Sequence, residues 1–151
     1  MTQPLRRIIA QNRSGQAVAI PSICSAHPAV LEASLTLAQT LGAPLMIEAT
    51  SNQVNQDGGY TGMTPPDFIA FVTAIAQAAG FEPKSLLFGG DHLGPQAWRA
   101  LPAAAAMDKA RDLVADYARA GFGKLHLDCS EGCAGETAQL PDAVTAARSA
   151  D

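Results

Sequence analysis

An aspartate and a histidine stand side by side at Asp91 and His92, directly after two glycines and a short apolar run. A carboxylate can move a proton, and a neutral imidazole can bind a divalent metal. Gly89 and Gly90 leave room for a ligand beside the backbone, because neither carries a side chain. Such a pair also occurs as a hydrogen-bonded strand end, so the two residues alone do not decide between structure and chemistry.

Glu48 is a second candidate catalytic residue, in the apolar segment LMIEATS at residues 45–51. Side chains alternate between the two faces of a strand, so Glu48 shares a face with Met46 and Thr50. A carboxylate among apolar neighbours requires a partner, because an unpaired buried charge is costly. Two roles stay open for it: a structural hydrogen bond or ion pair, and a catalytic or ligand-binding acid.

Polar residues suited to binding a substrate follow the other apolar segments. Their hydroxyl, amide and carboxylate groups offer donors and acceptors to a polyhydroxy ligand, and the amide- and glycine-rich residues 52–63 extend this supply. His27 precedes Pro28 at a predicted helix start, where it either caps the helix or contacts a ligand. The candidate substrate-binding residues are Ser25, His27, Ser51, Asn52, Gln53, Asp128 and Ser130.

A repeating order of strand, loop and helix positions these residues. Apolar or alternating runs predict strands at residues 17–24, 45–51 and 124–130, and another that starts at residue 86 and ends near Asp91 and His92. Start and stop signals predict helices at residues 28–42, 64–80 and 103–120, with shorter helices before residue 15 and from residue 141. Four such units in succession predict a parallel α/β fold.

The parallel fold predicts where the candidate residues meet. Right-handed crossovers place the C-terminal ends of all strands at one edge of the sheet. Ligands bind at that edge in closed barrels and in open sheets alike. A complete barrel of eight units takes about 250 residues, so 151 residues with four units make either an open sheet or roughly half of a barrel.

Composition narrows the classes of partner. The formal net charge is −4, and the ten Lys and Arg residues form no basic stripe, which argues against nucleic acid as the main partner. The three cysteines lack paired CxxC spacing, so we expect neither a disulfide framework nor a structural zinc site, and a reducing cytoplasm fits. No segment reaches the roughly 18 apolar residues of a membrane span, so we expect no membrane partner.

The sequence resembles the Z subunit family of D-tagatose-1,6-bisphosphate aldolase, also labelled tagatose-6-phosphate kinase-like. The resemblance spans nearly the whole chain and rests on CSAHP at 24–28, IEATSNQVNQDGGYTGMTP at 47–65, GGDHLGP at 89–95 and AGFGKLHLDCS at 120–130. It implies a TIM barrel related to class II aldolases, with residues 1–151 as the N-terminal half of a single barrel domain that is truncated at its C-terminus. It also implies that Asp91 is an acid/base carboxylate and that His92 binds a divalent metal, zinc or similar.

The resemblance also implies an unfinished ligand set. Family members are more than twice as long, and the remaining metal-binding histidines of the related aldolases come from later strands. A catalytic zinc normally has three protein ligands, whereas this chain supplies His92 with only Glu48 or His126 nearby. We therefore expect the isolated chain to be inactive or nearly so.

Two alternative functions are expected from the resemblance and from the polar residues at the strand ends. The first is a non-catalytic subunit that stabilises a separate aldolase catalytic subunit in galactitol, tagatose or N-acetylgalactosamine catabolism. The alternative is a metal-dependent enzyme acting on ketohexose phosphates, either a C4 epimerase or a class II aldolase-like lyase. A sugar kinase lacks support, because no GxxxxGK loop is present. A sugar phosphate is the expected ligand, and self-association is expected because the apolar faces of an incomplete barrel rarely stay exposed.

Overall fold

The computed structural model describes residues 3–151, with side chains from Leu5 onward. Its four strands form one parallel sheet in the order β1-β2-β3-β4. The elements are α1 (Gln3–Arg13), β1 (Ser22–Cys24), α2 (Pro28–Leu41), β2 (Leu45–Thr50), α3 (Pro65–Ala78), β3 (Leu86–Leu93), α4 (Ala103–Ala120), β4 (Lys124–Leu127) and α5 (Asp142–Ala150), with the short 3₁₀ helices η1 (Pro83–Ser85) and η2 (Pro95–Trp98). The predicted α/β class is confirmed, and the sheet is consistent with part of a TIM-like barrel.

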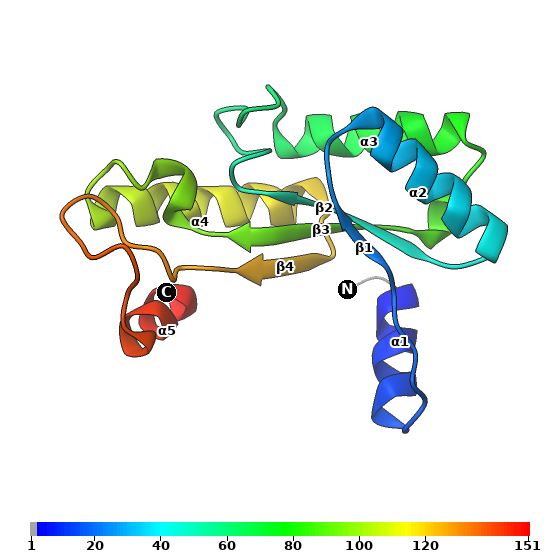
Figure 1. Cartoon of the computed structure of the whole chain (residues 1–151), viewed down its shortest axis with the longest axis horizontal. Coiled ribbons are helices and arrows are strands. Elements are labelled where there is room, and N and C mark those ends of the chain that lie inside the picture. The colour runs from blue at the N-terminus through cyan, green and yellow to red at the C-terminus, as the bar shows by residue number, and fades with distance from the viewer. Residues whose placement is uncertain (1–2) are drawn as a thin grey trace.

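The helices are unevenly distributed around the sheet. In Figure 1, α2 and α3 lie above the sheet, whereas α1 and α5 are drawn below it. Residues of α2, α3 and α4 share one apolar core with the sheet, and α1 projects from the end at which the strands begin. One sheet face is therefore packed on helices, and the other carries the polar side chains described below.

The predicted helix boundaries are confirmed within about two residues. Pro28 occupies the first position of α2, and Gly42 ends that helix in the left-handed region at φ 61°. The N–H of Thr64 donates to the Asp67 carboxylate at 3.0 Å, which completes the predicted capping box of α3. Gly121 ends α4 at φ 104°.

Two predicted strands are shorter in the structure. The prediction of a strand over residues 17–24 was wrong for its first part, because β1 begins only at Ser22. Pro21 has no N–H to donate to a neighbouring strand, and the carbonyl of Val18 accepts instead from the Asn12 side chain at 2.7 Å. The predicted strand at 124–130 ends at Leu127, because Asp128 forms a local turn with Ser130.

Tyr117 of α4 joins the core to the loop after β2. Its side chain is fully buried, and its ring contacts Phe122 with a centroid separation of 4.3 Å. Its hydroxyl donates to the carbonyl of Val54 at 2.9 Å. A side chain at Gly90 would overlap Leu93 and press on the Tyr117 ring, so the glycine permits this packing. No helix within residues 3–151 is long and apolar enough to cross a bilayer.

We predict that Tyr117→Phe lowers the free energy of unfolding by about 1–2 kcal/mol, because the buried Val54 carbonyl loses its donor. Tyr60→Phe is the matched control, since Tyr60 is 73% exposed and the same change there should stay within about 0.5 kcal/mol. Urea unfolding monitored by circular dichroism measures both variants. Equal midpoint shifts for the two would contradict the role given to the Tyr117 hydroxyl.

Candidate functional site

A partly buried ion pair crosses the sheet next to the candidate site. Pairing of the strands puts Glu48 of β2, Gly89 of β3 and Lys124 of β4 in one row. Lys124 Nζ lies 2.7 Å from Glu48 Oε1, although that oxygen accepts no hydrogen bond of regular geometry, so the attraction is mainly coulombic. A side chain at Gly89 would overlap the Glu48 carboxylate, so this glycine lets the two charges meet across β3.

A bulge near the end of β3 changes the direction of His92. Gly90 pairs with Leu125, whereas Leu93 pairs with Leu127, so β3 contains one residue more than β4 over this stretch. Within residues 3–151, His92 is the only residue other than glycine with a positive φ, at 50°. Neighbouring side chains of a regular strand point to opposite faces, but here the irregular backbone brings the His92 imidazole beside the Asp91 carboxylate.

Asp91 lies between two imidazoles. Its Oδ2 is 3.0 Å from His92 Nδ1, and its Oδ1 is 2.9 Å from His126 Nδ1. Lys124 Nζ lies 3.6 Å from the same Oδ1. Partial burial raises the pKa of Asp91, but the hydrogen bonds of His126 and His92, together with the nearby positive charges, outweigh it and lower the pKa to about 2. Asp91 is therefore an ionised, firmly paired carboxylate near neutral pH.

Asp91, His92 and His126 offer a donor set for a divalent metal. One donor atom from each lies within 4.8 Å of the others. Two imidazoles and a carboxylate are ligands that zinc and non-haem iron accept. Each imidazole directs Nδ1 at Asp91, so the three side chains converge on one place. The residue types and their spacing therefore fit such an ion.

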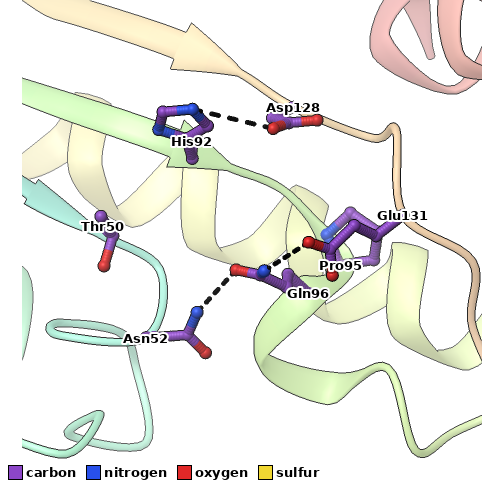
Figure 2. Close-up of a pocket in the computed structure, with 7 residues that line it drawn as sticks. All are labelled: Thr50, Asn52, His92, Pro95, Gln96, Asp128 and Glu131. Atoms are coloured by element: carbon purple, nitrogen blue, oxygen red, sulfur yellow. Dashed lines mark hydrogen bonds and ion pairs between the residues drawn. The ribbon is translucent and has the colours of Figure 1, made fainter. Parts of the chain in front are cut away.

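A cavity of about 300 Å³ opens beside this cluster. Figure 2 shows its polar lining, in which the Asn52 amide donates to Gln96 at 2.6 Å and the Gln96 amide donates to Glu131 at 2.8 Å. On the other side His92 Nε2 lies 3.9 Å from Asp128 Oδ2. The hydroxyl and N–H of Ser130 donate to Asp128 and lower the pKa of its carboxyl. The cavity lining is Thr50, Asn52, His92, Pro95, Gln96, Asp128 and Glu131.

Comparison with known proteins places this chain in a family. The family described as D-tagatose-1,6-bisphosphate aldolase subunit GatZ/KbaZ-like matches residues 5–151. The chain belongs to this family. A similar solved structure is that of a probable tagatose 6 phosphate kinase from Sinorhizobium meliloti 1021, with 62% identity and a TM-score of 0.85. The match covers 88% of this chain and 34% of that chain, so the present chain spans about a third of the length of its solved relative.

The structure of this GatZ/KbaZ-like chain places the predicted site residues in three groups. Asn52, His92 and Asp128 line the cavity, and Asp91 lies beside it. Three others form hydrogen bonds within the chain. The Ser51 hydroxyl donates to the His92 carbonyl at 3.3 Å, and the Gln53 side chain accepts from the Thr50 N–H at 2.8 Å. The Ser130 hydroxyl donates to Asp128.

The remaining predicted residues lie outside the cavity lining. Glu48 is 5% exposed and forms the ion pair with Lys124, which is the structural role considered for it. His27 is exposed at the start of α2 and makes no capping hydrogen bond through its side chain. The Ser25 hydroxyl accepts from the His27 N–H at 3.1 Å, which makes a local turn.

Sequence reasoning did not select Lys124, Thr50, Gln96 or Glu131 for this GatZ/KbaZ-like site. Alternation within the fourth strand puts Lys124 on the same face as His126, so the sequence pattern could have identified Lys124. Thr50 shares the face of Glu48 in the same way. Gln96 lies in the short 3₁₀ helix η2 after β3, and Glu131 lies in the loop after β4, so neither segment has a periodicity that indicates which side chains turn inward.

We predict that Lys124→Met lowers the free energy of unfolding by about 2–3 kcal/mol, because it leaves the buried Glu48 carboxylate without its cation. Adding Glu48→Gln to Lys124→Met should recover part of the loss. Lys109→Met is the control, since it breaks the exposed ion pair with Asp57 and should cost less than about 1 kcal/mol. A double-mutant cycle in urea that gives zero coupling between Glu48 and Lys124 would contradict the assignment.

Acid should destabilise the chain partly through Asp91. Its pKa is depressed on folding, so its contribution is present above the unfolded value near 4 and is lost as the pH falls toward 2. The free energy of unfolding should therefore fall by about 2 kcal/mol more in the wild type than in Asp91→Asn between pH 4 and pH 2. Asp112→Asn, on the exposed side of α4, should follow the wild type. Parallel pH profiles for the wild type and Asp91→Asn would rule out this contribution.

Proposed function

We propose that this chain is part of a non-catalytic subunit that stabilises a separate D-tagatose-1,6-bisphosphate aldolase subunit. The family match over residues 5–151 is the observation that supports a role in this aldolase. Because the chain spans 34% of its solved relative, the proposal concerns the longer protein, in which these four βα units supply the first half of a TIM barrel. The pathway would be galactitol, tagatose or N-acetylgalactosamine catabolism in the cytoplasm, with copies of the chain self-associating.

The charge pairing at the strand ends supports a non-catalytic role. A general base works best when its pKa lies near the working pH, whereas Asp91 is held near 2 by its two histidine partners. Glu48 is buried against Lys124 and does not line the cavity. Both candidate catalytic carboxylates thus have partners within the chain, and they contribute to the stability of the sheet without a substrate.

The enzymatic alternative is less well supported, but the donor set at Asp91, His92 and His126 defines how it would work. A divalent metal bound there would polarise the carbonyl of a ketohexose phosphate and stabilise negative charge on its oxygen. Asp91 would hold both imidazoles in position, and Asn52 and Asp128 would bind sugar hydroxyls. The epimerase or lyase activity would then depend on His92.

One preparation distinguishes the two functions. When the chain is mixed with the aldolase catalytic subunit, we expect the half-life of aldolase activity at 37 °C to increase several-fold, because a bound partner stabilises the folded state. His92→Ala should give the same support, as should the exposed control His27→Ala. Turnover of tagatose 1,6-bisphosphate or epimerisation of fructose 6-phosphate by the chain alone with added zinc or manganese, lost in His92→Ala, would instead establish the enzyme.

A further inference from the structure

The positive side chains divide into two sets. Six of the ten each form an ion pair with a carboxylate, and they come from α4, β4, α5 and the segment before α4: Arg99, Lys109, Arg111, Arg119, Lys124 and Arg148. Within residues 3–151, the other four have no carboxylate within 4.0 Å: Arg6, Arg7, Arg13 and Lys84. These four cations therefore differ from the other six, each of which has a carboxylate partner.

The fold gathers these four cations at one end. Arg6, Arg7 and Lys84 line a hollow of about 890 Å³, between α1 and the segments that precede β2 and β3. Arg6 and Arg13 line a second hollow of about 600 Å³ on α1. Both hollows lie where the strands begin, the end from which α1 projects in Figure 1, whereas the candidate site lies at the opposite end. We name the four residues the basic end surface.

The basic end surface is positively charged, whereas the chain as a whole has a negative net charge. Because its four positive charges are included in the net charge of −4, the rest of the chain carries −8. The helix that supplies three of the cations has no acidic residue. Leu5, Ile8 and Ile9 recur at helical spacing on the same helix and are only partly buried. Apolar side chains bordered by unpaired cations are the composition of a protein interface with a charged rim.

We propose that the basic end surface docks an acidic surface of a protein partner, which, on the function proposed above, is the aldolase catalytic subunit. Unpaired arginines attract carboxylates over several ångströms and bind them in a bidentate way on contact. Docking at this end leaves the cavity at the opposite end open. The partly buried residues Leu5, Ile8 and Ile9 would supply the apolar centre of the contact.

The test compares two charge-reversed variants with the same change in net charge. Arg6→Glu with Arg7→Glu reverses the basic end surface, and Arg111→Glu with Arg119→Glu reverses two cations on α4 as the control. Binding to the immobilised aldolase catalytic subunit is measured at low and physiological salt. The first pair of substitutions should raise the dissociation constant roughly tenfold or more, mainly through slower association. It should also remove most of the salt dependence of binding. The control pair should retain both.

Each failure has a separate meaning. If the wild-type chain does not bind the catalytic subunit, the proposed function fails and the docking proposal with it. If the wild type binds and both charge-reversed pairs bind equally well, only the docking surface is wrong. Sedimentation of the wild type, but not of Arg6→Glu with Arg7→Glu, with phosphatidylserine vesicles while aldolase binding is unchanged would assign the surface to a membrane instead. Circular dichroism confirms that each variant is folded.

Discussion

The ion pair between Lys124 and Glu48 is the interaction on which the polar face of the sheet depends. It joins β4 to β2 across the glycine of β3, so three strands share one electrostatic contact. The Glu48 carboxylate is almost fully buried, and a buried carboxylate without a cation would destabilise the fold by several kcal/mol. Lys124 also approaches Asp91, which in turn holds both histidines. The arrangement of the site therefore begins at a contact in the sheet.

The bulge in β3 is the second constraint, because it decides which side chains can share Asp91. A regular strand would direct His92 toward the helix-covered face, whereas the left-handed residue brings it back to the polar face. The Ser51 hydroxyl binds the carbonyl of the same residue and holds the irregular backbone. Strained backbone of this kind is concentrated at functional sites. The imidazole of His92 is consequently presented to the cavity by the backbone, and its position does not depend on a flexible loop.

Local signals predicted most of this fold because they act between residues close in sequence. Pro28, the Thr64–Asp67 capping box and the terminal glycines fix helix ends, and apolar runs mark the strands. The bulge was not predictable, since it depends on the register between β3 and β4. The partnership of Glu48 and Lys124 was missed for the same reason, as their strands are not neighbours and meet only across a glycine. Gln96 and Glu131 reach the cavity from the short helix η2 and from the loop after β4, where strand alternation does not predict the direction of a side chain.

The polar residues at the strand ends suggest catalysis, because burying ionisable groups lowers the stability of the fold and a non-catalytic subunit would have no reason to do so. That argument weakens when the groups satisfy one another. Glu48 has Lys124, Asp91 has two imidazoles, and Asp128 has the hydroxyl and N–H of Ser130. Such pairing offsets desolvation within the chain, so the cluster persists without any ligand. Arg6, Arg7, Arg13 and Lys84, which pair with no carboxylate of residues 3–151, lie instead at the other end of the sheet, where the proposed partner would supply the carboxylates.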